Sequence, residues 1–179
     1  MRLFTGISIP AHITAALTGA VAELRSSLDL RWSPPENLHV TTKFIGRWAV
    51  ERLPELQNAL AGINAPEAFE VTVAGFGFLP NPQRPRIFFA GIEPNARLTE
   101  LAAATDGAAT LLGVKGEDRA YNPHVTLARL RGERFGVVSA PEFGSFPVRE
   151  FHLYESKPGP VTSSYSILSS YPLTKAGNQ

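Results

Sequence analysis

Two copies of a short histidine-threonine pattern are the residues in this sequence best suited to chemistry. Residues 37–41 read NLHVT and residues 122–126 read NPHVT, an offset of 85 residues. In an extended strand, residues i and i+2 point to the same face. The histidine and threonine of each copy should therefore project together, His39 with Thr41 and His124 with Thr126.

Two imidazoles and two hydroxyls facing one groove would suit in-line displacement at phosphorus. That reaction needs one proton removed from the attacking oxygen and another delivered to the leaving oxygen, on opposite sides of the phosphorus. Imidazole can fill either role near neutral pH. Hydroxyls of Thr41 and Thr126 can donate hydrogen bonds to the non-bridging oxygens. We expect no metal and no other cofactor, since a histidine can protonate the leaving group.

The other two histidines of the chain fit structural roles. His12 also has a threonine two positions on, but it follows Pro10 at a helix start, where i and i+2 do not share a face. We expect His12 at a helix start or on the surface, and His152 as a hydrogen-bonded strand residue. Strand burial alone gives no reason to repeat a polar pair, so the repeat favours function for His39 and His124.

A second match in the same register suggests an internal duplication. Residues 4–7 (FTGI) fall on residues 89–92 (FAGI) with the same offset of 85 residues. After each of these strands a proline leads into a helical stripe with steps of three and four residues. The stripes are Ile13, Leu17, Val21, Leu24 and Leu28 in the first half, and Leu98, Leu101, Thr105, Ala108 and Leu112 in the second. Each half therefore predicts a strand, a helix and a strand that bears His-x-Thr.

Shorter patterns predict the remaining elements. A helix is expected over residues 51–63, and strands over 69–73, 147–154 and 164–171. Two Pro/Gly-rich stretches predict connections: 79–86 as the crossing between lobes and 131–146 as a surface loop. The tail, 175–179, is expected to fray.

These elements together predict an α+β fold. The repeat implies two lobes related by a pseudo-twofold axis, each an antiparallel-rich sheet with helices, flanking a central groove. We expect one two-lobed domain over residues 1–179, with halves of approximately 1–85 and 86–179.

Composition bounds the class of partner. Seventeen Lys and Arg against sixteen Asp and Glu are too balanced for a protein that coats nucleic acid electrostatically, so an anionic substrate must be held by a few placed groups. The absence of cysteine excludes disulfides, thiolate catalysis and cysteine-ligated metals. No signal peptide and no apolar run of about 20 residues is present, so we expect a cytoplasmic monomer without a membrane or protein partner.

At these motifs the sequence resembles the 2H phosphoesterase superfamily, named for two His-x-Thr/Ser motifs. It is most similar to the RNA 2′,3′-cyclic phosphodiesterase branch of bacteria and archaea, also called 2′-5′ RNA ligase. The likeness covers nearly the whole chain in order: the opening strand to Pro10, residues 37–46, 85–92 and 122–129, and the closing stretch from 165 to 173.

The resemblance implies a two-lobed α+β fold and hydrolysis of RNA 2′,3′-cyclic phosphates to 2′-phosphomonoesters. It also implies a weaker, reversible 2′-5′ ligation of RNA ends. The partner expected from the resemblance is an RNA 3′ end with a 2′,3′-cyclic phosphate, for which tRNA-derived RNA is a candidate. By resemblance, His39 protonates the departing 3′ oxygen and His124 activates the water; the residues alone do not separate acid from base. The family commonly has Leu where this chain has Thr42, a position expected to face away from the groove.

Three further residues are candidate substrate contacts. The family often has a phosphate-contacting arginine where Arg129 stands, although strand parity sets Arg129 off the catalytic face unless the strand bends. Lys43 shares parity with His39, and Phe44 could stack on a nucleobase, although its parity favours the core. Groove-lip candidates are Tyr121, Arg84 and Arg86.

Three alternatives to an RNA phosphodiesterase stay open. The same fold could act on a small cyclic phosphate, such as a nucleotide 2′,3′-cyclic phosphate or ADP-ribose cyclic phosphate. It could also be a nucleotide- or RNA-binding module without turnover, which the presence of both histidines disfavours. A two-histidine metal site is disfavoured because neither motif offers a nearby carboxylate or further ligand.

Overall fold

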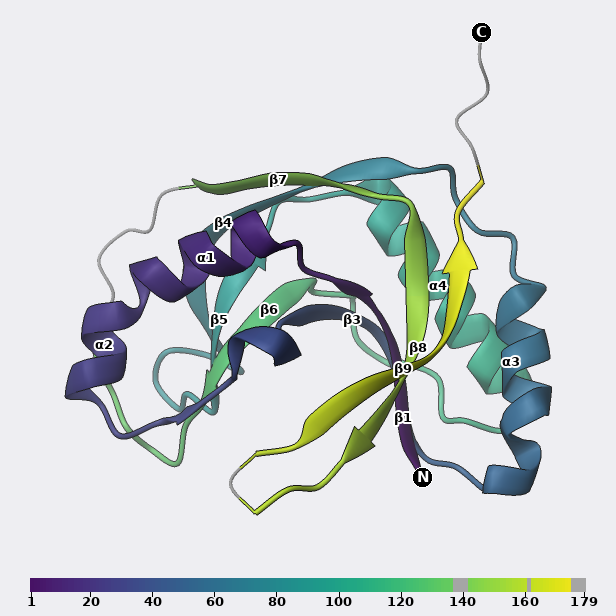
Figure 1. Ribbon diagram of the computed structural model, residues 1–179, viewed down its shortest axis with the longest axis horizontal. Coiled ribbons are helices and arrows are strands. Elements are labelled where there is room, and N and C mark those ends of the chain that lie inside the picture. Colours follow the sequence, from purple (N-terminus) through teal and green to yellow (C-terminus); the bar gives the residue numbers. More distant parts are fainter. Residues whose placement is uncertain (137–141, 161, 175–179) are drawn as a thin grey trace, which may run out of the picture.

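The computed structural model describes residues 1–136, 142–160 and 162–174. In this part of the chain the strands form one nine-stranded antiparallel sheet in the order β7-β4-β5-β6-β3-β1-β8-β9, with β2 paired to β6 (Figure 1). The strands are β1 (Arg2–Ser8), β2 (Arg31–Trp32), β3 (His39–Arg47), β4 (Phe69–Leu79), β5 (Ile87–Ile92), β6 (His124–Arg129), β7 (Glu142–Val148), β8 (Glu150–Lys157) and β9 (Ser164–Pro172). The predicted α+β class is confirmed.

The centre of the sheet has the symmetry that the repeat predicts. The two motif strands, β3 and β6, are neighbours, and Val40 lies opposite Val125, its own equivalent at an offset of 85 residues. On either side, β1 corresponds to β5, β8 to β4 and β9 to β7. The two sequence halves interleave, since β4 belongs to the first half but pairs with β5 and β7 of the second.

The match between residues 4–7 and 89–92 is not preserved in how the two strands pair with the motif strands. Ile7 lies opposite Val40, whereas Ala90 lies opposite Val125, so β1 and β5 differ by two residues in their pairing with the motif strands. Gly6 is needed by close approach: a Cβ there would lie 2.5 Å from the carbonyl oxygen of Val40. Glycine is required at position 6 by this contact with the motif strand, and not by a turn that both sequence halves share.

Equivalent β-bulges interrupt the two motif strands just after the threonines. In β3 the partners of Thr5 and Gly6 are Lys43 and Thr41, which leaves Thr42 as the extra residue. In β6 the pairing skips Leu127, which is equivalent to Thr42 by the 85-residue offset. An extra residue reverses the alternation of all side chains that follow it.

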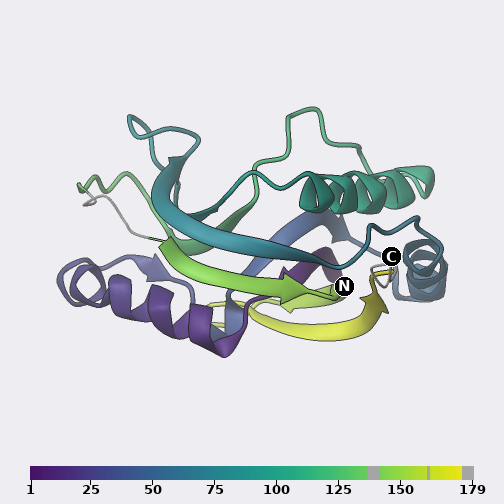
Figure 2. The ribbon, with the colours of Figure 1, turned by 90° about the horizontal axis from the view of Figure 1, so that it is seen from above.

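Four helices complete the described fold: α1 (Ala11–Ala20), α2 (Ala22–Ser27), α3 (Leu53–Ala61) and α4 (Ala96–Leu111), with short 3₁₀ turns η1 (Pro35–Asn37) and η2 (Val50–Arg52). The stripe predicted through Leu28 is divided between α1 and α2 at Val21. The Asn95 side chain caps α4 by accepting a 3.0 Å hydrogen bond from the backbone N–H of Leu98. Helix α1 packs against β7 and α4 against β3, on opposite sides of the sheet (Figure 2).

Several predicted segments need correction. The strand expected over 69–73 continues to Leu79, and the one expected over 147–154 is the end of β7 followed by β8. In the expected loop over 131–146, residues 137–141 lie outside the described residues and 142–146 are the start of β7. Among the described residues β7 is an edge strand with a ladder partner on one side only, where glycine and proline are tolerated. Residues 79–86 join the paired neighbours β4 and β5 and do not cross between lobes.

The predicted helix over 51–63 is confirmed as η2 and α3, and the strand over 164–171 as β9. The tail 175–179 lies outside the described residues. No helix in the described part of the chain is long and apolar enough to cross a membrane.

Candidate active site

The central register brings the two motifs together. Because β3 and β6 are antiparallel about Val40 and Val125, His39 lies across from Thr126, and His124 lies across from Thr41. Directly opposed side chains on one face are about 4.5–5.5 Å apart at Cβ. The two valines between them are fully buried on the other face, and the four polar side chains are partly exposed. The predicted constellation is therefore assembled.

Backbone carbonyls set the orientation of both imidazoles. Nδ1 of His39 lies 2.6 Å from the Asn37 carbonyl oxygen, and Nδ1 of His124 lies 2.8 Å from that of Asn122. A carbonyl can only accept, so each Nδ1 carries the hydrogen and each Nε2 is the nitrogen free for proton transfer. Nε2 of His39 also lies 3.0 Å from the Thr41 hydroxyl.

Both imidazoles are held towards the neutral form. Burial is the main reason that the pKa of His39 is lowered from 6.5 to about 4; the charges of His124 and Arg129 act in the same direction, and the hydrogen bond to Asn37 opposes them. Burial also lowers the pKa of His124, against its hydrogen bond to Asn122. Positive charge on His124 and Arg129 disfavours protonation of His39, and a bound anion would offset that effect.

The bulges change the predicted faces of the residues after each motif. Lys43 is turned away from the site and is 2 % exposed, so the prediction that it contacts substrate is wrong. Its ammonium lies 2.6 Å from the Asp106 carboxylate of α4 and 3.3 Å from Glu117, and donates a 2.7 Å hydrogen bond to the Lys115 carbonyl.

The bulges turn Phe44 and Arg129 towards the site face, in contrast to Lys43. Phe44 lies opposite Phe4, whose ring is 4.7 Å from the imidazole of His39, so Phe44 is on the site face; it is 61 % exposed and not in the core. Arg129 lies opposite Ile87, two residues from Phe89, whose ring is 5.2 Å from that of His124. The bulge at Leu127 therefore returns Arg129 to the face that carries Thr126.

The remaining sequence candidates have structural places. Thr42 is buried, and its hydroxyl lies 2.7 Å from that of Thr5. Tyr121 donates a 2.8 Å hydrogen bond to the Thr41 carbonyl at the site's edge, and burial raises its pKa. Arg84 and Arg86 are exposed in the β4–β5 connection.

His12 and His152 lie where predicted. His12 is exposed at the start of α1, with its Nε2 3.2 Å from the Ser145 carbonyl oxygen. His152 is buried in β8, with its Nδ1 2.8 Å from the Ser170 hydroxyl.

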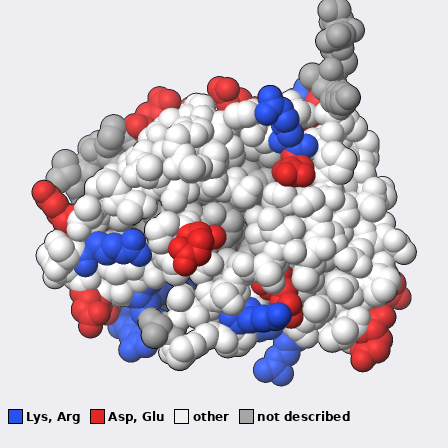
Figure 3. Space-filling view, viewed as in Figure 1, with Lys and Arg blue, Asp and Glu red and all other residues white. Residues whose placement is uncertain are grey.

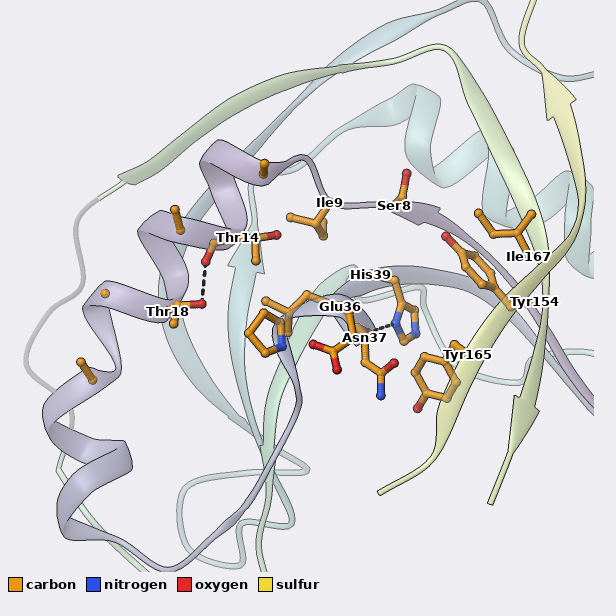
Figure 4. A pocket seen from close by; sticks show the side chains of 16 residues that line it. Ser8, Ile9, Thr14, Thr18, Glu36, Asn37, His39, Tyr154, Tyr165 and Ile167 are labelled. Carbon is orange, nitrogen blue, oxygen red and sulfur yellow. Dashed lines mark hydrogen bonds between the residues drawn. The ribbon is translucent and has the colours of Figure 1, made fainter. Parts of the chain in front are cut away.

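A groove of about 1060 Å³ opens beside His39, between α1, η1 and the β8–β9 hairpin. In Figure 4 His39 lies at its centre, with Tyr154 and Tyr165 on one side and Thr14 and Thr18 of α1 on the other. The front of the molecule is hollowed near its centre, and the wall of the hollow is mainly uncharged (Figure 3). Among the described residues that line the groove, Glu36 is the only charged one. His39 lines this groove and His124 does not.

Sequence reasoning missed the ring contacts around His39. Tyr165 meets the imidazole edge to face with centroids 5.2 Å apart, and Tyr154 lies 6.0 Å away. Tyr154 belongs to β8 and Tyr165 to β9, and both are far from His39 in the sequence. Tyr154 ends a run of four consecutive buried residues in β8, so no alternation in this strand indicates which face its ring is on. No group of three or more potential metal-ligating side chains is found among the described residues.

Comparison with known proteins identifies relatives over nearly the whole chain. The family model described as LigT like Phosphoesterase matches residues 7–89 and 91–162. The chain is 32 % identical over 181 residues to the RNA 2′,3′-cyclic phosphodiesterase of Thermus thermophilus, covering 97 % of this chain and 90 % of the relative.

Solved structures have the same fold. The protein TT0787 of Thermus thermophilus superposes with a TM-score of 0.85 at 31 % identity, over 99 % of this chain and 100 % of that one. Escherichia coli LigT in complex with 3′-AMP gives a TM-score of 0.85 at 28 % identity, over 97 % and 98 % of the two chains. With a family model that spans both motifs and a relative of this identity over nearly its whole length, the chain belongs to the LigT-like phosphoesterase family.

Proposed function

We propose that this protein hydrolyses 2′,3′-cyclic phosphates at RNA 3′ ends to 2′-phosphomonoesters, with two histidines as general acid and base and without a metal. The observation that carries the proposal is the central register, which sets His39 and His124 diagonally across one face with a threonine opposite each. The activity for which the Thermus thermophilus relative is named supports the choice of substrate.

In the proposed reaction His124 accepts a proton from water at its Nε2 as the water oxygen bonds to phosphorus. The bond from phosphorus to O3′ breaks, and Nε2 of His39 delivers a proton to O3′. The product carries a 3′ hydroxyl and a 2′-phosphate, and exchange with solvent restores both imidazoles. If a 5′ hydroxyl of a second RNA takes the place of water, the same step forms a 2′-5′ bond.

The groove supports His39 as the proton donor. In an in-line displacement that expels O3′, the terminal nucleoside lies on the leaving-group side and the water on the other. The groove, large enough for a nucleoside, opens beside His39 and is not lined by His124. Its single carboxylate, Glu36, is unfavourable for a phosphate but compatible with a base or ribose.

The lowered pKa values fit an anion-dependent site. Both imidazoles tend to be neutral in the free protein, so the negative charge of the bound phosphate is needed to favour the protonated donor. We assign the Thr41 and Thr126 hydroxyls to the non-bridging oxygens and the Arg129 guanidinium to the developing charge. Phe44 is the proposed stacking surface for a base.

The test is incubation with an RNA oligonucleotide that ends in a 2′,3′-cyclic phosphate, in EDTA. The wild type should yield a 2′-phosphate, and His39→Ala and His124→Ala should each lose at least about a hundredfold in kcat. His12→Ala is the matched control, because it removes the third His-x-Thr histidine, which is exposed on α1. Full activity in either motif variant would refute the two-histidine mechanism, and loss of wild-type activity in EDTA would indicate metal catalysis.

Dependence on pH provides a second test. A donor that must be charged and an acceptor that must be neutral give a bell-shaped profile of kcat/KM. Because the pKa values of both histidines are lowered in the free enzyme, the maximum of the kcat/KM profile should lie below pH 6.5. A profile that is flat from pH 5 to 9 would contradict the assignment. Nucleoside 2′,3′-cyclic phosphates and ADP-ribose cyclic phosphate, assayed in parallel, test the alternative that the site acts on small molecules.

A further inference from the structure

Two arginines lie opposite each other on β1 and β3, at the end of these strands that is far from the catalytic histidines. Neither has a carboxylate partner among the described residues. Arg2 of β1 pairs directly with Arg47 of β3, and both are exposed. Like charges directly opposite on a sheet are destabilising. Among the described residues, neither arginine has a carboxylate within ion-pairing distance, although pairs such as Arg52 with Glu55 form elsewhere. The fold itself therefore gives no reason for this pair.

The arginines line a cavity of about 600 Å³ that also includes Lys157 and Glu155. Lys157 is paired with Glu155 at 3.3 Å, so that carboxylate is already committed to another cation. Of the described charged side chains that line the cavity, three are cationic and one is anionic. The cavity is suited to a phosphate, which two guanidinium groups can bind by several charge-assisted hydrogen bonds.

A continuous face joins this cavity to the catalytic pair. The pairing of β1 with β8 runs without a bulge from Leu3 to Gly6. Alternation continued to both ends of the strand sets Arg2, Phe4, Gly6 and Ser8 on one face of β1. Ser8 is the partner of His39, and the six steps from Arg2 to Ser8 span about 20 Å. Between the two ends lies the exposed ring of Phe44, 6.2 Å from Phe4.

We propose that Arg2 and Arg47 form a second phosphate subsite, which binds a backbone phosphate of the RNA strand a few nucleotides upstream of the cyclic end. An exposed aromatic ring followed by a cationic cavity is the combination that binds single-stranded nucleic acid, by stacking and by backbone charge. The inference rests on the proposed function of the catalytic site. It makes the enzyme selective for oligonucleotides over cyclic mononucleotides, although the net charge of the chain is near zero.

The test compares substrates of increasing length with an Arg2→Gln/Arg47→Gln double variant. For the wild type, kcat/KM should rise from a nucleoside 2′,3′-cyclic phosphate to an oligonucleotide of about four or more nucleotides. In the double variant the ratio of kcat/KM on the long substrate to that on the short one should fall at least about tenfold, since the loss of a single charge-assisted hydrogen bond already has that effect. The slope of log affinity against log salt should weaken by about 0.7 for each phosphate that the variant no longer binds.

Arg149→Gln is the matched control, since it removes one exposed arginine at the opposite end of β8 from Lys157. For this variant, the ratio of kcat/KM on the long substrate to that on the short one (the length ratio) should equal that of the wild type. Thermal melting checks that each variant is folded. An unchanged length ratio in the double variant, or a wild type indifferent to length, would overturn the subsite. Binding of a 2′-phosphorylated oligonucleotide, followed by fluorescence anisotropy, decides the subsite even if no cyclic phosphate is hydrolysed, so the two proposals can fail separately.

Discussion

The lowered pKa of His39 predicts a specific loss of stability in acid. Because folding lowers this pKa from 6.5 to about 4, the folded protein binds fewer protons than the unfolded chain between these values. The stabilisation is fully present above pH 6.5 and is lost as the pH falls towards 4. Linkage gives a loss of about 2 kcal/mol at pH 5 and about 3 kcal/mol at pH 4.

The measurement is the free energy of unfolding in urea at pH 7.5 and pH 5, for the wild type and His39→Gln. Glutamine keeps a polar side chain but cannot titrate, so the fall between the two pH values should be about 2 kcal/mol smaller in the variant. Contributions of His124 and His152, whose pKa values burial also lowers, largely cancel in the comparison. His12→Gln is the control for removing a histidine, because it replaces an exposed side chain and leaves His39 in place. Equal falls in wild type and His39→Gln would refute the view that folding holds His39 neutral.

Three other substitutions test how the site is supported. Lys43→Ala leaves the Asp106 carboxylate without its buried partner and should lower the free energy of unfolding by about 3–5 kcal/mol, measured in urea. Lys43→Met removes the same charge but keeps most of the side-chain packing, so it should cost less; an equal cost would show that the lost ion pair dominates and packing adds little. Gly6→Ala puts a Cβ 2.5 Å from the Val40 carbonyl, so kcat should fall although no reacting group is removed, and wild-type kcat would contradict the tight β1–β3 contact. Arg129→Ala should lower kcat/KM about tenfold or more and raise the pKa of His39 in an NMR titration. Arg129→Lys should preserve the pKa of His39 and lose part of the rate. An unchanged pKa of His39 in Arg129→Ala would place Arg129 away from the site.

The sequence sufficed for the central pair of strands because identical requirements act on both copies. Each motif needs a histidine and a threonine on one face and a buried valine on the other, and both copies have the order His-Val-Thr that alternation along a strand requires. The start of β7 could not be predicted, because an edge strand tolerates the glycine and proline that otherwise mark a loop. The ring contacts of Tyr154 and Tyr165 with His39 depend on the pairing of β1 with β8, which no local pattern encodes.

The bulges explain why parity failed directly after each motif. An alternation rule extended past Thr41 sets Lys43 on the site face and Phe44 in the core, and the structure has the reverse. One extra residue, Thr42, is enough for this change, and its buried hydroxyl is satisfied by Thr5. A polar residue at a position expected to be apolar was the only local indication of an irregularity.

The same bulges give a symmetric pair of strands an asymmetric site. Phe44 and Arg129 are equivalent by the 85-residue offset, and each is returned to the site face by the bulge before it. One position then offers an aromatic ring on the side of β1 and the Arg2–Arg47 pair, and the other offers a cation whose charge lowers the pKa of His39. A substrate with a base at one end and a reacting phosphate at the other can be oriented by that difference. Exchanging the two residues, Phe44→Arg with Arg129→Phe, should therefore cost more in kcat/KM on oligonucleotides than either single alanine variant, since it reverses the order of stacking and charge; a cost no greater than that of Arg129→Ala would show that orientation comes from the groove beside His39 alone.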